Sequence, residues 1–259
     1  MGRGFPSAGA GKTPELRALL PRKLPAGLGM RASRVGHADV AGDASTSPSR
    51  LKAATTQWMR QLVVGHGLCP WAAAALPSAR IRCIEAGPAD VAASLAIVDT
   101  EAQRLMAAPG GLEEGVQAEV EADTPLSTTL LVFGHGGYDG LEGLRAFQEL
   151  WQKAERALEP LWKGTLHSIK LLAFHPLRED RGPGCRSSPL DEGHYGARAP
   201  FPLLQLLRSS DLEVARASWA ARHGGPGALG LLLRNKATLR ALGRKELVGL
   251  MEVFRGFES

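Results

Sequence analysis

A cysteine followed directly by a proline is the first residue pair in this chain whose placement suggests chemistry. Cys69 and Pro70 stand in the run GLCPWAAAA. Proline suits the first turn of a helix, so we expect a helix from Pro70 with Cys69 at its N-cap. Unpaired amides and the helix dipole would there favour the thiolate, which is the nucleophilic form. The alternative is a small buried hydrophobic side chain between Leu68 and Trp71, because free cysteine is commonly buried.

A histidine ends an apolar, β-branched run that predicts a strand over 165–176. His175 is followed by Pro176, which holds the preceding backbone extended. Ligands of open α/β sheets bind beyond the carboxyl ends of strands, where a histidine suits a base, an acid or a metal ligand. The alternative is a histidine that only ends the strand with a satisfied hydrogen bond. A thiolate and imidazole pair formed by Cys69 and His175 is the sharpest catalytic hypothesis, although no third orienting group can be named.

Three further polar residues are candidates for binding a substrate. Arg198 stands in a proline-rich loop, and Arg208 stands on the helix that we expect after it. Arginine binds carboxylate or phosphate in a bidentate manner, which favours a small anionic molecule; the alternative is a surface arginine paired on its own helix. Asn235 either completes the pocket or bonds backbone groups that fix the packing of the last helices.

Several weaker patterns argue against a cofactor or a metal. The glycine-rich segment VFGHGGYDGLEG, which contains His135, lacks dinucleotide-binding spacing and is better explained as a strand-to-helix loop. The segment GAGKT has Pro6 where a phosphate-binding loop needs its first glycine. The three cysteines show no CxxC spacing, so a structural zinc site is not expected, and a reducing compartment is the simpler inference. We therefore expect neither a cofactor nor a metal ion.

The pattern along the chain alternates between strands and helices. Helical spacing begins at Ala54, and strands are predicted within 79–87, 127–134 and 165–176, with amphipathic helices between them. A long irregular segment follows over 177–200, and the remainder is predicted as helices. Crossover helices of this length imply right-handed connections. We expect an α/β fold with a small, mostly parallel three-stranded sheet and additional helices at both ends.

The positive charge of the chain is concentrated at its N-terminus. Residues 1–52 hold nine of the 31 Lys and Arg but only three of the 26 Asp and Glu, which leaves a net charge of −1 for the rest. The near-neutral remainder argues against nucleic acid as a partner. We interpret residues 1–53 as a transit peptide, for a chloroplast or alternatively a mitochondrion, or as a disordered leader. Residues 54–259 then form a single α/β domain, and no stretch approaches the length of a membrane span.

Four short segments in a fixed order resemble a known family. These are GLCPWA, LLAFHP, APFPLLQLLR and LLLRNKATLRALG, spread from about Thr55 to Leu242. They resemble an uncharacterised family of domains of unknown function, numbered 1415 in its series. The matching positions are Cys69, Pro70, Ala72, Phe174, His175, Pro176, Arg198, Pro200, Pro202, Leu207, Arg208, Arg234 and Asn235. The chain departs from the family pattern at Gly67, Ala197 and Ala199, where the family tends to have Asn, Asn and Ser.

Two classes of function remain open on this sequence. The first is a thiol-assisted or histidine-assisted enzyme that acts on a small anionic substrate, using Cys69 and His175 with Arg198, Arg208 and Asn235. The second is a noncatalytic binding or assembly factor, which the three lost polar groups favour. The family resemblance implies no established activity, and the sequence identifies no protein partner.

Overall fold

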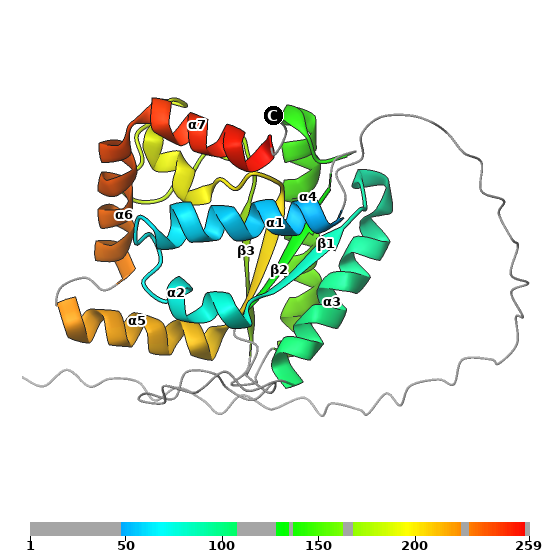
Figure 1. Ribbon diagram of the computed structural model, residues 1–259. Helices are drawn as coiled ribbons and strands as arrows, with labels where there is room; N and C mark the ends of the chain where they lie inside the picture. The colour runs from blue at the N-terminus through cyan, green and yellow to red at the C-terminus, as the bar shows by residue number, and fades with distance from the viewer. Residues whose placement is uncertain (1–47, 108–127, 135–136, 163–167, 224–227, 257–259) are drawn as a thin grey trace, which may run out of the picture. The chain divides into compact units, whose positions relative to one another are not determined.

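Four strands form the central sheet of the computed structural model, which describes residues 48–107, 128–134, 137–162, 168–223 and 228–256. The strands are β1 (Arg80–Ile84), β2 (Thr128–Phe133), β3 (Ile169–Phe174) and β4 (Leu203–Arg208), in the order β1-β2-β4-β3 (Figure 1). β1 pairs in parallel with β2, and β4 is antiparallel to both β2 and β3. The first three strands therefore point the same way.

The α/β class and the first three strands are confirmed, but the expected three-stranded sheet was wrong. β4 inserts between β2 and β3, where a helix had been expected. Its run LLQLL is short and apolar, and such a run does not distinguish a buried strand from a buried helix by periodicity. Leu203, Leu204 and Leu206 are almost completely buried, as a central strand covered on both faces requires.

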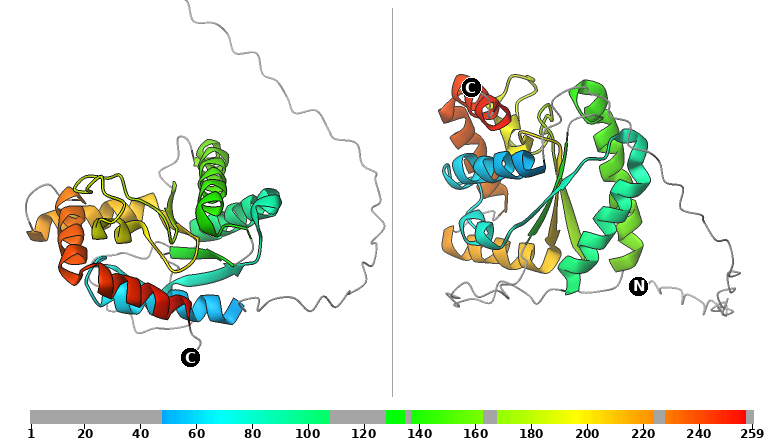
Figure 2. Two further views of the ribbon diagram at one scale, coloured as in Figure 1. Left: turned by 90° about the horizontal axis from the view of Figure 1, so that it is seen from above. Right: turned by 45° about the vertical axis from the view of Figure 1, so that its right-hand side comes forward.

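Helices cover both faces of this sheet. The α-helices are α1 (Pro48–Trp58), α2 (Ala72–Ala75), α3 (Val91–Ala107), α4 (Gly140–Trp162), α5 (Ser209–His223), α6 (Ala228–Leu242) and α7 (Arg244–Arg255). Shorter turns are the π-helix η1 (Met59–Val64) and the 3₁₀ helices η2 (Leu76–Ser78), η3 (Pro88–Asp90) and η4 (Glu192–Ala197). α3 and α4 lie on one face, and α1 and α7 on the other (Figure 2).

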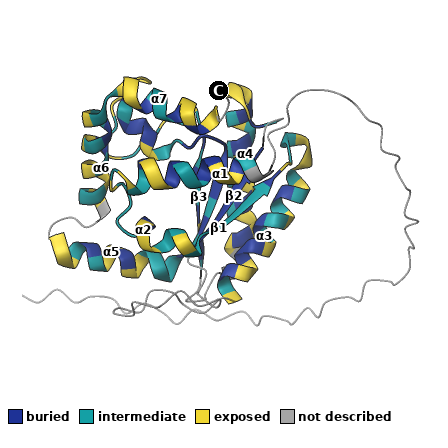
Figure 3. Cartoon of the chain, in the orientation of Figure 1, coloured by how far each residue is buried: buried dark blue, intermediate teal, exposed yellow. Residues whose placement is uncertain are grey.

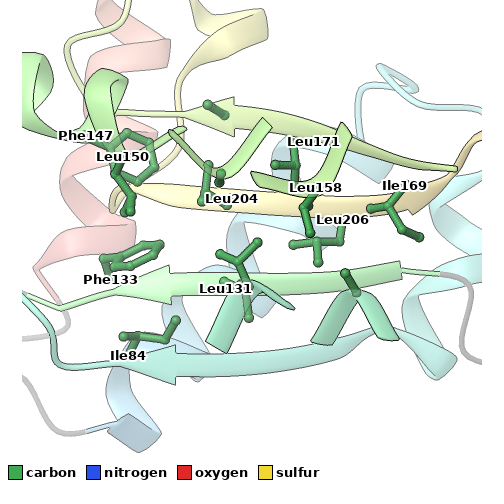
Figure 4. Packing of buried hydrophobic residues seen from close by; sticks show 14 of the residues in the cluster. Ile84, Leu131, Phe133, Phe147, Leu150, Leu158, Ile169, Leu171, Leu204 and Leu206 are labelled. Atoms are coloured by element: carbon green, nitrogen blue, oxygen red, sulfur yellow. The ribbon is translucent and has the colours of Figure 1, made fainter. Parts of the chain in front are cut away.

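Alternating strand residues separate two hydrophobic cores. Leu131, Phe133 and Leu204 point toward α3 and α4 and pack with Phe147 and Leu150 (Figure 4). The opposite face of the same strands packs against α1, α6, α7 and η4 through the residues Leu130, Val132, Leu203, Leu51, Trp58, Tyr195, Leu239, Leu247, Met251 and Phe254. The sheet is thus buried on both faces, and its edges carry the polar groups.

The N-terminal helix differs from the expectation in where it begins. α1 starts at Pro48 and not at Ala54, and Leu51 in its second turn is fully buried. Thr55 and Thr56 follow Ala54 inside the helix. Helical geometry continues through η1, where Met59 and Leu62 are buried.

A long irregular segment over 175–202, predicted from its glycine and proline content, crosses from β3 to β4 and contains η4. It is held to α6 by two ion pairs. Asp191 binds Arg240 at 2.7 Å, and Asp180 binds Lys236 at 2.6 Å. Many of its residues are buried, including Tyr195, although it has little regular structure (Figure 3). The segment is therefore a packed part of the fold.

Several predictions concern residues that lie outside the described ranges. These are the GAGKT match, His135 and most of the leader. Of the leader, the structure describes only the last residues. Within the described ranges, no helix combines the length and the apolar character that crossing a bilayer requires.

Candidate functional site

The carboxyl ends of β1, β2 and β3 lie together at one end of the sheet, which we call its carboxyl edge. The register pairs Ile84 of β1 with Phe133 of β2, and Leu203 of β4 pairs with Phe174 of β3. The segments that leave these strands meet there, since the Gly134 amide donates to the Ile84 carbonyl oxygen at 2.8 Å. Ligand sites of open α/β sheets lie at this kind of edge.

His175 is at this edge, directly after β3, as the sequence predicted. Its Nδ1 accepts a hydrogen bond from the Leu177 amide at 3.1 Å, which leaves the proton on Nε2. Nε2 donates to the Tyr138 carbonyl oxygen at 2.7 Å. The residue is 1% exposed, and burial lowers the pKa of its imidazole. His175 is therefore a neutral ring with both nitrogens engaged, which joins the end of β3 to the segment before α4.

Three arginines lie on the segments next to His175, and two of them, Arg178 and Arg255, act on its imidazole through their charges. Arg178 follows it by one turn, donates to the Ala173 carbonyl oxygen and stacks over Trp151. Arg198 donates from Nε to the Arg178 carbonyl oxygen at 3.0 Å. Arg255, the last residue of α7, donates from Nε to the Pro200 carbonyl oxygen at 3.0 Å. We call Arg178, Arg198 and Arg255 the arginine cluster.

The ion pairs seen among the described residues involve other basic side chains, namely Arg80, Arg82, Arg104, Arg208, Lys236 and Arg240. Burial lowers the pKa of the Arg178 and Arg255 guanidinium groups, although both remain charged at neutral pH. Asp139 lies close enough to raise the pKa of Arg255 and of His175 through its charge. Asp180 and Glu155 likewise act on Arg178 through their charges, so the edge holds charges of both signs.

Cys69 lies elsewhere in the fold. The segment 69–78 leads into the amino end of β1, whereas His175 follows the carboxyl end of β3, and these two strands run in the same direction. No described contact joins the two side chains. The structure therefore does not bring the proposed thiolate and imidazole together.

The surroundings of Cys69 also raise the pKa of its thiol. Burial is the main cause, and hydrogen bonds from the Trp71 and Ala72 amides offset it only in part. These amides are the helix-end donors that the sequence suggested, but α2 begins at Ala72 and spans only four residues. A half-buried thiol with a raised pKa agrees better with the alternative, in which Cys69 is a packing residue.

Asn235 is at the Cys69 end of the molecule. Its Nδ2 donates to the Leu68 carbonyl oxygen at 2.5 Å, and the neighbouring Arg234 donates to the Gly67 carbonyl oxygen. Arg234 also lies over the Trp219 ring, 4.8 Å from its centroid. Asn235 thus bonds backbone groups and holds the turn before Cys69 to α6.

Arg208 is far from the arginine cluster along the sheet. It is the last residue of β4 and pairs in register with Ile169, so it lies at the opposite edge from His175. Its Nε forms an ion pair with Asp211 at 3.0 Å, and both side chains are largely buried. The expected position on a helix was wrong, because β4 is a strand.

The departures from the family pattern have structural explanations. Gly67 has a φ of +61°, a left-handed conformation that Gly and Asn adopt more easily than other residues. Ala199 is fully buried, and the Ala197 carbonyl oxygen accepts from the His175 amide at 3.3 Å. Glycine thus suits the left-handed backbone at 67 and a small residue suits the buried position 199, and none of the three changes removes a group from the arginine cluster.

Two members of the arginine cluster were missed from the sequence. Arg178 stands three residues after His175 in FHPLR, and this proximity was the available signal. Arg255 comes from the last helix, and nothing local to it indicates that α7 ends beside the 175–202 segment. The described residues contain no group of three or more His, Cys, Asp or Glu side chains able to hold a metal ion.

The four segments that carry the family resemblance meet in two pairs. The Cys69 segment meets α6 through Leu68 and Asn235, and the His175 segment meets the Arg198 loop. A family model described as "Protein of unknown function (DUF1415)" matches residues 50–248. The chain belongs to the DUF1415 family. The expected family is thus confirmed. No curated protein and no solved structure gives a significant match to this DUF1415 chain.

Proposed function

We propose that this DUF1415 protein binds a small anionic molecule at the arginine cluster. The observation that carries the proposal is that three arginines meet at the carboxyl edge of the sheet, where Arg198 donates to the Arg178 backbone and lies close enough to Arg255 to lower the pKa of its guanidinium. A planar guanidinium offers two parallel donors to a carboxylate or phosphate group. An oxyanion between Arg178, Arg198 and Arg255 would lower their mutual repulsion and replace the water lost on burial.

Binding receives more support than catalysis. A general base needs a free ring nitrogen, and both nitrogens of His175 are engaged with backbone groups. A cysteine nucleophile needs a lowered thiol pKa, and burial raises that of Cys69. We infer that His175 is a positioning residue, which holds β3 and the Tyr138 segment together beneath the arginines.

Calorimetric titration of the protein with citrate and with inorganic phosphate tests the proposal. We expect Arg255→Gln to weaken binding by roughly 10-fold to 100-fold, since a hydrogen bond to a charged group contributes about 1.5–3 kcal/mol. Arg216→Gln is the matched control, because Arg216 is an exposed arginine on α5 away from the carboxyl edge. Equal effects of the two substitutions, or no binding of either anion by the unmodified protein, would contradict the proposal.

A further inference from the structure

A second cluster of reactive side chains lies outside the arginine cluster, between the 175–202 segment and α6. Lys236 is 3% exposed, and its Nζ lies 2.6 Å from Oδ2 of Asp180 and 2.5 Å from Sγ of Cys185. Asp180 and Cys185 belong to the irregular segment, and both are half-buried. We call Lys236, Asp180 and Cys185 the lysine–cysteine cluster.

The nitrogen and the sulfur are in direct contact. Nζ of the buried Lys236 reaches Sγ of Cys185 while it also binds the Asp180 carboxylate. The thiol, the amine and a carboxylate thus meet at one point of the fold. Because the first two already touch, a single oxygen atom can bridge them without rearrangement of the fold.

We propose that Cys185 and Lys236 form a covalent N–O–S cross-link when the protein meets hydrogen peroxide. A first peroxide oxidises the thiol to a sulfenic acid and is reduced to water. The Lys236 ammonium passes its proton to the Asp180 carboxylate, and a second peroxide accepts the electrons as the O–N bond forms. One S–H and one N–H hydrogen leave. The thiol, the amine and the two peroxides thus give the bridge and three waters.

Asp180 is placed to assist this step. Its Oδ2 contacts the Lys236 nitrogen directly, while its Oδ1 accepts from the Gly182 amide at 2.8 Å, which fixes the carboxylate. Burial raises the pKa of the Cys185 thiol, and its bond to Lys236 offsets this in part. At neutral pH little of the thiol is in the reactive thiolate form. Cross-linking is consequently expected to be faster at alkaline pH than at neutral pH.

The cross-link would join two elements that are otherwise held by noncovalent contacts. Cys185 lies in the same 175–202 segment as Arg178 and Arg198, and Lys236 lies on α6. Oxidation would therefore lock this segment to α6. This consequence concerns the mobility of the segment, and the cross-link itself does not depend on whether an anion binds.

Mass spectrometry of the full chain, treated with hydrogen peroxide and digested with trypsin, tests the proposal. Trypsin cleaves after Arg181 and Arg186 and after Arg234 and Arg240, and a modified Lys236 resists cleavage. The expected product is one branched peptide that joins 182–186 to 235–240. Its mass equals the summed masses of the two separate peptides plus one oxygen atom and minus two hydrogen atoms. A thiol reductant is expected to return the two peptides.

Three variants separate this cross-link from general oxidation. Cys185→Ser must abolish the branched peptide, Cys69→Ser must leave it unchanged, and Asp180→Asn must slow its formation severalfold. Cys69 is the matched control, because it is half-buried and its sulfur is bonded only to backbone amides. A Cys185 recovered only as sulfinic or sulfonic acid, or a branched peptide without the added oxygen, would overturn the proposal.

Discussion

Replacing Asp191 with asparagine removes the buried charge that holds the 175–202 segment to α6. The carboxylate accepts from Arg240 Nε at 2.8 Å and from Arg240 Nη2 at 2.7 Å. It also accepts from the Arg186 amide at 2.8 Å and from the Gly193 amide at 3.3 Å. Its side chain is completely buried. Asparagine keeps the shape but turns one acceptor into a donor that faces another donor.

The expected loss in the free energy of unfolding is about 3 kcal/mol. Breaking a buried ion pair by removing one partner costs about 3–5 kcal/mol, and the carbonyl oxygen that asparagine retains puts the loss at the lower end. Urea unfolding followed by circular dichroism measures it. Asp99→Asn is the matched control, because Asp99 is a partly exposed aspartate whose hydrogen bond from the Gln103 side chain, at 2.8 Å, lies on the surface. This control is expected to cost less than about 0.5 kcal/mol.

The pH dependence of the same variant gives a second check. Arg240 and two backbone amides hold the pKa of Asp191 far below its ordinary value. A depressed carboxyl pKa stabilises the fold above the unfolded value of about 3.9, and this stabilisation is lost as pH falls through the folded value. The difference between the two proteins is thus complete at neutral pH and shrinks in acid. A loss at Asp191 no larger than at Asp99 would refute the reasoning.

Two further outcomes follow from the positions of His175 and Cys69. Because burial lowers the pKa of His175, unfolding releases an imidazole that takes up a proton below about pH 6.5, and stability falls by up to about 1.4 kcal/mol per pH unit there. Urea unfolding of His175→Asn across this range is expected to show a smaller slope, and an unchanged slope would contradict a buried neutral ring. Because burial raises the pKa of Cys69, its alkylation by iodoacetamide is expected to be slower than that of a free thiol and unaffected by His175→Asn. A fast alkylation that His175→Asn slows would instead support the catalytic pair of Cys69 and His175.

Local patterns account for what was predictable from the sequence. β1, β2 and β3 are flanked by helices of clear periodicity, so their runs could be assigned, and His175 could be placed at a strand end. β4 was missed because LLQLL satisfies the pattern of either a buried strand or a helix. Its position between β2 and β3 is decided by pairing with residues far away in the sequence.

The site was harder to predict than the sheet for a physical reason. The backbone amides that lower the pKa of the Cys69 thiol could be anticipated from the sequence. Whether burial raises this pKa by more depends on packing against segments that are distant in the sequence. The engagement of both His175 nitrogens depends on Tyr138, and the arginine cluster depends on α7 ending beside the 175–202 segment. Charge and hydrogen bonding at such a site are set by tertiary contacts, which residue spacing does not encode.

Anomalous diffraction from crystals soaked in selenate tests the central claim most directly, because selenate has the shape and charge of a tetrahedral oxyanion and its selenium can be located. We expect a selenium peak with oxygens within about 3.2 Å of the guanidinium nitrogens of at least two of Arg178, Arg198 and Arg255. The peak is expected to disappear in Arg255→Gln and to persist in Arg216→Gln. Selenate bound elsewhere, with the arginine cluster empty, would contradict it.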